Sequence, residues 1–367
     1  MVEKKTKPIL PDYAVPPGET LRETLEGLNM TQAELADRTG RPKKTINEIL
    51  QGKAAITADT ALQFEKVLGV PASFWNNLER DYQSTMARLR EEEKLRSQTD
   101  WLKQFPVASM IKLGWVKKEA APNLQLREIL TFFGVADVAV WQRLWESPSA
   151  VYRRSPAWES SEYALASWLR KGEVEAAKIP CAPYDARTFR SALEGIRILT
   201  MEAPETFQPK MKELCASAGI ALTFVAELPK TRVYGATRWL GPSKALIQLS
   251  LRGKSDDHFW FTFFHEAGHI LLHGKRAAFV DIAVEKNDPM PAENHQEEEA
   301  NAFAKDFLIP PSSYRAFRAE GKFDEAELRR FAEAIGIAPG IVVGRLQHEG
   351  VIPFSQSNGL KQRFTAN

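Results

Sequence analysis

The segment HFWFTFFHEAGHILLH, residues 258–273, constrains the fold more than any other part of the sequence. Its apolar residues surround the helix axis almost completely, and a helix that is apolar nearly all round is buried. Good helix N-terminal residues occupy positions 255–257, and Gly274 is a good C-terminal one. We therefore predict a buried helix, in whose interior paired histidines need polar partners.

His265, Glu266 and His269 form an HExxH pattern on this helix. Two histidines four residues apart project from one helical face, so both imidazoles can bind one zinc ion. Glu266 flanks that face, where its carboxylate can take a proton from a water whose pKa the ion lowers. The pattern predicts zinc ligands at His265 and His269 and a catalytic base at Glu266. It does not identify the oxyanion-stabilising donor, for which the candidates are Tyr234, Arg238 and His295.

A catalytic zinc ion needs a third protein ligand. His273 lies two turns from His265, about 12 Å along the helix axis, so it is excluded as the third ligand. The next helix is predicted over HQEEEANAFAKDFLIPP, where a carboxylate ligand is available. We select Glu297, because it shares a face with Asn301, which can orient it, and we keep Glu298 in reserve. The alternative is that these glutamates only complement the dipole at a helix N-terminus.

A second pattern lies near the N-terminus. Thr31 opens a capping box, Gly40 supplies a turn, and PKKTINEIL forms the next helix. In a helix-turn-helix unit the second helix enters the major groove of double-stranded DNA. The alternative is an ordinary helical bundle with a solvated, charged face. The predicted DNA contacts are Gln32, Lys43, Lys44, Thr45, Asn47, Gln51 and Lys53. The predicted core of this bundle is Leu21, Leu25, Leu28, Leu35, Ile46, Ile49, Leu62 and Leu68.

Composition limits the remaining possibilities. The formal net charge of +2 over 367 residues is too small for the whole chain to bind polyanions, so DNA contacts must come from a local patch. No apolar run approaches the roughly 20 residues of a membrane span, and the first residues lack a signal core. We expect a cytoplasmic protein without membrane contact. Cys181 and Cys215 lack metal or disulfide spacing, which indicates packing residues.

The order of patterns predicts an α+β, mostly helical fold with a five-helix N-terminal bundle and a zincin-like C-terminal domain containing a small sheet. Strands are expected at ALTFVAEL and ALIQLSL, and the tryptophan-rich middle is expected to be helical core, including Trp158. The expected domains are a flexible arm (1–20), a helix-turn-helix domain (21–72), a connecting helix (73–99), a helical middle domain (100–204), a zinc metallopeptidase domain (205–355) and a tail (356–367).

Two resemblances add to this interpretation. HEAGHILLHG followed by EEEANAFAKDFLIP resembles the ImmA/IrrE family of metallo-endopeptidases over roughly residues 205–350. The resemblance implies that His265, His269 and Glu297 bind zinc, that Glu266 is the catalytic base, and that the chain hydrolyses peptide bonds, commonly in a repressor or partner protein. The N-terminal helix-turn-helix departs from the usual pattern of this family, because many such peptidases lack one.

The segment from MTQAELADRTG to FWNNLERDY is similar to the XRE-type domain of HigA-type antitoxins. That similarity implies operator binding, and we expect a homodimer on an inverted repeat. Pro42 stands where a serine or threonine cap is usual, and Glu48 stands where a basic residue often lies.

Two functions remain open from the sequence. The first is a zinc-dependent endopeptidase fused to a DNA-binding domain, which regulates transcription by cleaving a repressor or partner protein in an addiction module, mobile element or stress response. The second is a HigA-type antitoxin, an operator-binding repressor whose C-terminal domain binds a cognate toxin or senses a signal without appreciable proteolysis.

Overall fold

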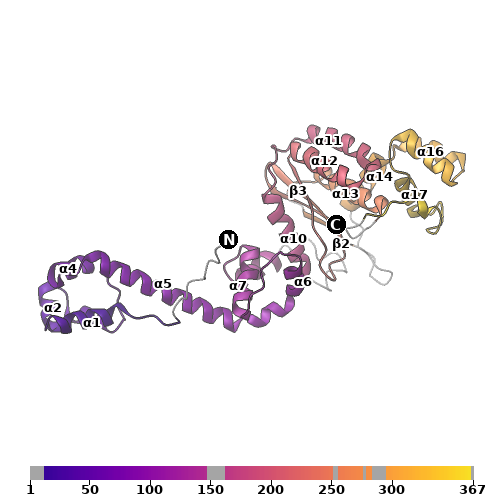
Figure 1. Cartoon of the computed structure of the whole chain (residues 1–367). Helices are drawn as coiled ribbons and strands as arrows, with labels where there is room; N and C mark the ends of the chain where they lie inside the picture. Colours follow the sequence, from indigo (N-terminus) through magenta and orange to yellow (C-terminus); the bar gives the residue numbers. More distant parts are fainter. Residues whose placement is uncertain (1–11, 147–161, 251–254, 276–277, 283–294, 365–367) are drawn as a thin grey trace, which may run out of the picture. The chain divides into compact units, whose positions relative to one another are not determined.

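The computed structural model describes residues 12–146, 162–250, 255–275, 278–282 and 295–364. The chain divides into two compact units, one comprising Met1–Asp100 with Ala121–Leu124, the other Trp101–Ala120 with Gln125–Asn367 (Figure 1). The predicted α+β, mostly helical fold class is confirmed. Among the described residues, no helix has the length and apolar character needed to span a membrane.

The N-terminal unit is helical. Its helix α1 begins at Pro17, four residues before the predicted start, so the expected arm is too long. A proline suits the first helical turn, where its missing N–H has no partner to lose. Gly18 then lets α1 approach the backbone of Ile49 and Leu50, which an added Cβ would strike. The helices of this unit are α1 (Pro17–Gly27), α2 (Gln32–Thr39), α3 (Lys43–Leu50), α4 (Ala58–Leu68) and α5 (Ala72–Ser97).

The core of this unit contains most of the predicted residues, with two exceptions. Leu28 is 47% exposed and Leu62 is 51% exposed, so both predictions were wrong. Leu28 follows the last residue of α1, and Leu62 lies off the buried face of α4, which presents Ala61, Phe64 and Leu68 inward. The rings of Phe64 and Trp75 form a T-shaped pair, with ring centroids 5.5 Å apart.

The second unit begins with helices that share an aromatic cluster of Trp101, Phe105, Phe133, Trp141 and Tyr163. These rings are packed against one another, as predicted for the tryptophan-rich region, although Trp158 lies outside the described residues. The elements between α5 and the sheet are η1 (Thr99–Gln104), α6 (Val107–Lys112), α7 (Pro122–Phe133), α8 (Val138–Trp141), η2 (Gln142–Glu146), α10 (Glu162–Ala177), α11 (Ala186–Ile198), η4 (Leu199–Met201) and α12 (Pro204–Ser217).

A four-stranded mixed sheet forms the centre of this unit, in the order β1-β3-β2-β4. The strands are β1 (Ile220–Phe224), β2 (Val233–Gly241), β3 (Lys244–Leu249) and β4 (Ala278–Ile282). β1 pairs with β3 in parallel, while β2 is antiparallel to both β3 and β4. The two expected strands are β1 and β3, whereas β2 and β4 were not anticipated.

Helices cover both faces of the sheet. Leu222 and Ile247 belong to the large core that includes the helices after the sheet, while their neighbours Ala221 and Leu246 pack with Ala176 of α10 on the opposite face. This arrangement explains why β1 and β3 appear as continuous apolar runs. Because α10 covers one sheet face, the expected domain boundary at residue 205 falls inside a single compact unit.

The helices after the sheet complete the core. They are α13 (Asp256–Leu272), α14 (His295–Leu308), α15 (Pro311–Glu320), α16 (Glu325–Ile335), α17 (Pro339–His348) and η5 (Asn358–Leu360). Leu360 of the expected tail is buried, and the backbone N–H of Asp256 donates to the carbonyl oxygen of Gln362. The end of the described chain is therefore packed against the start of α13.

Candidate metal centre and nucleic-acid interface

Helix α13 carries the HExxH pattern through the interior of the second unit, as its apolar composition predicts. Phe259, Trp260, Phe263 and Phe264 are buried around it, and His265 and His269 are also buried. Gly268 lies within the pattern and faces α14, where an added Cβ would lie 3.3 Å from the Cα of Ala300. The glycine therefore allows the close approach that brings the two helices' polar side chains together.

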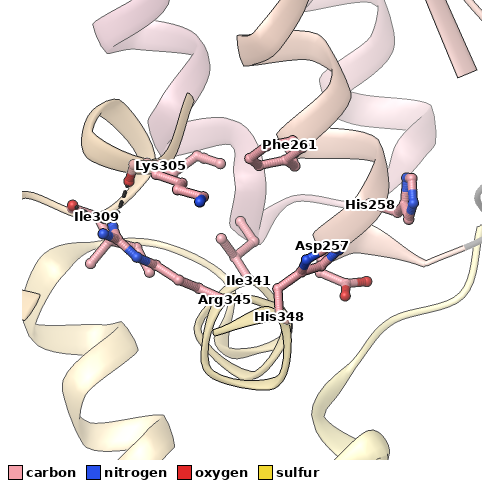
Figure 2. A pocket seen from close by; sticks show the side chains of 10 residues that line it. Asp257, His258, Phe261, Lys305, Ile309, Ile341, Arg345 and His348 are labelled. Carbon is pink, nitrogen blue, oxygen red and sulfur yellow. Dashed lines mark hydrogen bonds between the residues drawn. The ribbon is translucent and has the colours of Figure 1, made fainter. Parts of the chain in front are cut away.

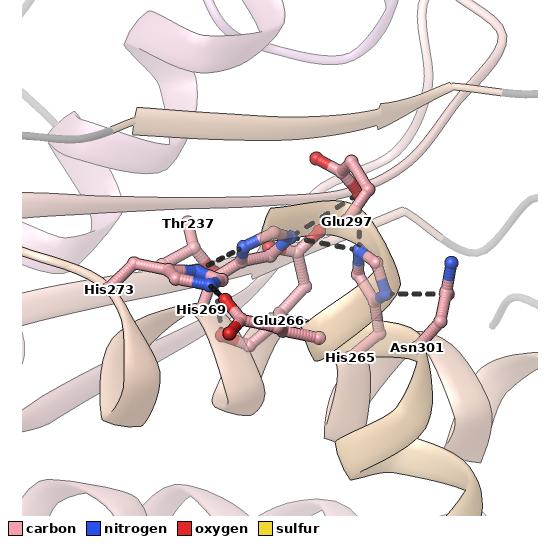
Figure 3. Close-up of polar contacts among 8 residues, drawn as sticks. Thr237, His265, Glu266, His269, His273, Glu297 and Asn301 are labelled. Carbon is pink, nitrogen blue, oxygen red and sulfur yellow. Dashed lines mark hydrogen bonds and ion pairs between the residues drawn. The ribbon is translucent and has the colours of Figure 1, made fainter. Parts of the chain in front are cut away.

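Three potential metal ligands converge between α13 and α14 (Figure 3). The Nε2 atoms of His265 and His269 are 3.0 Å apart. Oε2 of Glu297 lies 3.1 Å from Nε2 of His265 and 3.5 Å from Nε2 of His269. Tetrahedral zinc with bonds near 2.1 Å holds its ligand atoms about 3.4 Å apart. The separations in this cluster fit that requirement.

The other ring nitrogen of each histidine is engaged outside the cluster (Figure 3). Nδ1 of His265 donates to Oδ1 of Asn301, at 3.0 Å. Nε2 of His273 lies 3.1 Å from Oε2 of Glu299, and a carboxylate can only accept, so this nitrogen donates. Nδ1 of His273 is then the acceptor for Nδ1 of His269, at 2.9 Å. These outer hydrogen bonds point both Nε2 atoms at Glu297.

The electrostatics of the cluster favour a positive charge at its centre. Burial would raise the pKa of Glu297, but hydrogen bonds from both histidines lower it to about 2. Burial would lower the pKa of His265, but the hydrogen bond with Glu297 and the charges of Asp281 and Glu266 raise it to about 9. Burial lowers the pKa of His269 to about 4. A proton on His265 thus occupies the position that a metal cation would take, and binding a metal displaces it.

Glu266 is fully buried, and neither carboxylate oxygen has a hydrogen-bond partner among the described residues. Burial raises its pKa to about 8, against the opposing influence of His265. The side chain fits beneath β2 only because residue 235 is a glycine, since a Cβ there would lie 2.5 Å from Oε1 of Glu266. A carboxyl group in this environment can exchange a proton near neutral pH.

The structure separates the acidic residues that the sequence left ambiguous. Glu297 reaches the cluster, Glu298 is exposed, and Glu299 contacts His273. Asn301 orients His265 rather than Glu297, which corrects the expected role of this side chain. Sequence reasoning also missed His273 as an outer partner, although its spacing of four residues from His269 was the available signal.

Among the described residues, each of the three oxyanion candidates has a partner outside the cluster. Arg238 forms an ion pair with Glu173, and the ring of Tyr234 lies 4.3 Å from that of His258. The His295 side chain is 83% exposed and lies 3.4 Å from Glu299. Gly235, which accommodates Glu266, lay in a stretch that was not expected to be a strand, so its role had no sequence signal.

The N-terminal unit presents a polar helix face. Thr31 accepts the backbone N–H of Glu34 through its hydroxyl, and Gly40 adopts the left-handed conformation of the turn, with φ of 66°. On α3, Ile46, Ile49 and Leu50 are buried, which turns the opposite face to solvent. Among the predicted DNA contacts, Thr45 is half-buried and the exposed ones are Gln32, Lys43, Lys44, Asn47, Gln51 and Lys53.

Two features bear on the charge of this face. Lys44 lies 3.8 Å from Glu48 on the next turn, so one predicted phosphate contact has an acidic neighbour. The amide of Gln51 donates to Oδ1 of Asn47 at 3.1 Å, which links two predicted contacts on one face. Pro42 provides no side-chain cap to α3, in agreement with its departure from the usual cap residues.

The two units together define a class of protein, in which a helix-turn-helix unit is fused to an α+β unit with a cluster of two buried histidines and a half-buried glutamate. The chain belongs to the helix-turn-helix family through residues 21–75, and residues 220–347 match the IrrE N-terminal-like domain, which is metallopeptidase-like. Both predicted resemblances are confirmed. The chain thus joins a domain typical of transcriptional regulators to an IrrE-like domain.

Several proteins are similar to part of the chain. Virulence-associated protein I of Dichelobacter nodosus is 37% identical over 75 residues, which cover 20% of this chain and 69% of that protein. The uncharacterized HTH-type transcriptional regulator YddM of Escherichia coli (strain K12) is 33% identical over 63 residues, covering 17% and 67%. The solved structure of an addiction module antidote protein of a HigA family from Coxiella burnetii is 36% identical, covers 23% of this chain and 94% of its own, and has a TM-score of 0.22.

Proposed function

We propose that the chain is a cytoplasmic zinc-dependent endopeptidase tethered to DNA, which regulates transcription by cleaving a repressor or partner protein. The convergence of His265, His269 and Glu297 carries this proposal, because two buried histidines and one half-buried carboxylate bring three ligand atoms together at zinc-compatible separations. Four-coordinate zinc with three protein ligands leaves one position for a reactant, which is the arrangement of catalytic sites.

The proposed chemistry assigns a separate task to each side chain. When bound, a zinc ion supplies a Lewis acid for the peptide carbonyl and a positive charge that favours the ionised form of Glu266. His265, His269 and Glu297 would hold it, with Asn301 and His273 fixing the ring orientations. Glu266 takes a proton from the attacking water and returns it to the nitrogen of the departing amine.

The test of this chemistry uses three variants of the full chain. Glu266→Gln should keep about one zinc per chain and lose hydrolysis, since the amide preserves size but not basicity. Glu297→Ala should lose most of the zinc, whereas Glu298→Ala, altered at an exposed neighbour, should keep it. Zinc content is measured by atomic absorption, and cleavage is followed with the protein encoded beside this chain's gene. Hydrolysis by Glu266→Gln at the wild-type rate would refute the assigned base.

A second function is favoured by one observation, which is the complete burial of Glu266 beneath Gly235. If a peptide cannot reach this base, the domain binds zinc without hydrolysing peptides. It would then dock a cognate toxin or sense a signal, while the helix-turn-helix acts as an operator-binding repressor. The two functions differ in one measurement. Wild-type protein that binds zinc and the partner, but leaves the partner intact over hours, supports the second.

For the N-terminal unit, we propose that a homodimer binds an inverted repeat in double-stranded DNA through the exposed face of α3. Lys43 and Lys44 would hold phosphates, and Asn47 would contact a base edge. Replacing both lysines by Ala should reduce the salt dependence of binding by up to about two units of slope, on operator and random DNA alike. Lys66→Ala, on α4 outside this pair of helices, is the matched control.

Asn47→Ala should cost roughly 1–3 kcal/mol on operator DNA while leaving random DNA nearly unaffected. Footprinting of the promoter locates the operator, and titrations at two salt concentrations measure both effects. If no duplex showed salt-dependent binding, the N-terminal unit would be a protein-interaction domain instead.

A further inference from the structure

A cavity lies beside the metal cluster, on the same faces of α13 and α14. Its volume is about 90 Å³, and α13, α14 and α17 enclose it (Figure 2). Phe261 in its wall stands one turn before His265, with the two ring centroids 6.2 Å apart. Lys305 stands one turn after Asn301, which contacts His265. The cavity therefore lies next to the cluster along the same pair of helices.

The cavity has room for a small organic group. On the same measure, a single water needs roughly 10–15 Å³, so several non-hydrogen atoms fit. Its walls are mainly apolar, formed by Phe261, Leu308, Ile309 and Ile341. Binding sites of this kind combine apolar walls with a few polar groups that orient the ligand.

Among the described residues, the charged groups that line the cavity have partners, except the amine of Lys305 and one carboxylate oxygen, Oδ1 of Asp257. Arg345 donates to the carbonyl oxygens of Lys305 and Ile309, at 2.7 and 3.2 Å, and its Nε donates to Glu349. Asp257 pairs with Lys361 at 2.6 Å.

The amine of Lys305 is the cation without a hydrogen-bonded partner. Within the part of the chain that the structure describes, no carboxylate or carbonyl oxygen lies within bonding distance of this half-buried group. In Figure 2 the side chain of Lys305 extends toward Phe261 and Ile341. A positive charge therefore faces an apolar cavity without a directly bonded counter-ion among the described residues, although it lowers the pKa of Glu349 from a distance.

Two histidines add hydrogen-bonding capacity at the other end of the cavity. Burial, together with the charges of His258 and Lys305, lowers the pKa of His348, so this ring is neutral at pH 7. The ring of His258 lies against Tyr234. Among the described residues, the cavity thus combines one cation without a directly bonded counter-ion, apolar walls and hydrogen-bonding rings, which together match an amphipathic anion.

We propose that this cavity binds an apolar group that ends in a carboxylate, with the carboxylate at Lys305 and the apolar part between Phe261 and Ile341. The group could belong to a free small carboxylate, or to a residue of a peptide that lies at the metal cluster. The second source rests on the proposed peptidase function, while the first does not.

The chemistry is tested with 3-methylbutanoate and its neutral matched amide, 3-methylbutanamide. Both are titrated by calorimetry into the full-length, zinc-loaded Glu266→Gln protein, which cannot turn over a peptide by the proposed mechanism, and into Glu297→Ala protein, in which the acid has no zinc ion to bind. We expect the acid to bind at least tenfold more tightly than the amide, because only the acid compensates Lys305. Equal binding of acid and amide, or no binding of the acid up to about 10 mM, would overturn the proposal.

Variants of one position then test the cation. Lys305→Met preserves the length and apolar stem and should weaken binding of the acid at least tenfold, whereas Lys305→Arg should retain it. Lys322→Met, at an exposed lysine outside the cavity, is the control and should bind like the parent protein. If Lys305→Met fails to fold, the ratio of acid to amide affinity is compared between the parent protein and Lys305→Arg. A preference for the acid in both proteins supports a cation as the binding group. Unchanged binding by a folded Lys305→Met protein would refute the role of this residue.

The source of the carboxylate is resolved with N-acetyl-alanyl-leucine as free acid. A peptide source predicts that this acid binds at least tenfold more tightly than 3-methylbutanoate and loses that advantage in Glu297→Ala protein, which lacks the cluster. If the natural ligand is a free small carboxylate, the dipeptide should bind no more tightly than 3-methylbutanoate, and its affinity should not depend on Glu297. Binding of 3-methylbutanoate by protein that never hydrolyses a partner would retain the cavity proposal and remove the peptidase.

Discussion

Asp256 illustrates how one buried carboxyl group can govern stability. It is fully buried at the start of α13, where Oδ1 accepts the backbone N–H of Asp257 and Oδ2 has no partner among the described residues. Burial, followed by the charge of Asp257, raises its pKa to about 7. The folded protein therefore holds a proton on this group over a pH range in which the unfolded chain has released it.

The sign of the pH dependence follows directly. Between about pH 4 and pH 7 the folded state binds more protons, so the contribution of Asp256 to stability falls as pH rises and is constant above pH 7. Asp256→Asn keeps the acceptor for Asp257 and removes the titration. We expect the variant to gain up to about 4 kcal/mol relative to wild type between pH 4 and pH 8, measured by urea unfolding. Parallel stability profiles for the two proteins would contradict the prediction.

His273 provides a second test at the residue scale. Its side chain is only 3% exposed and connects Glu299 to His269. Removing an outer partner of a metal ligand typically weakens metal binding 10–100-fold. We expect His273→Gln to raise the zinc dissociation constant by that factor in competition with a chromophoric chelator. His295→Gln is the matched control, because His295 also contacts Glu299 but is exposed, and an equal loss there would argue against the relay.

At the scale of elements, strand β2 and helix α13 depend on a close approach at Gly235. Gly241 lies on the same strand but has open space around its Cβ position. Gly235→Ala forces a methyl group against Glu266 and should cost about 1–3 kcal/mol of unfolding free energy. Gly241→Ala should stay within about 0.5 kcal/mol of wild type. Equal effects in urea unfolding would mean that the contact with Glu266 is easily relieved.

At the scale of the whole molecule, the metal cluster belongs to one compact unit and the polar face of α3 to the other. A ligand that binds only the folded state stabilises the unit that holds it, by about 4 kcal/mol at a thousandfold excess over its dissociation constant. We expect chelation of zinc to lower the melting temperature of one transition in calorimetry and to leave the other unchanged. A shift of both transitions would indicate that the units unfold together.

The sequence by itself determined the features that depend on local periodicity. The spacing of His265 and His269 places both on one helical face, and the apolar residues around them require burial, so the buried helix and its histidine pair could be predicted. The capping threonine and the turn glycine likewise determined the helix-turn-helix pair. These signals lie within a few residues of one another and need no distant partner.

The tertiary structure alone decided which side chains meet across elements. The three consecutive glutamates at 297–299 have nearly the same sequence context, so the sequence alone does not distinguish them. Only the rotation of α14 against α13 directs Glu297 to the two histidines and Glu299 to His273. Strand β2 contains Gly235 and Arg238, which weaken its strand pattern; one edge pairs with β3, which follows it directly in the sequence, and the other edge pairs with the distant β4. The packing of β2 against α13 is also non-local, which is why the close fit of Glu266 under β2 could not be predicted from the sequence.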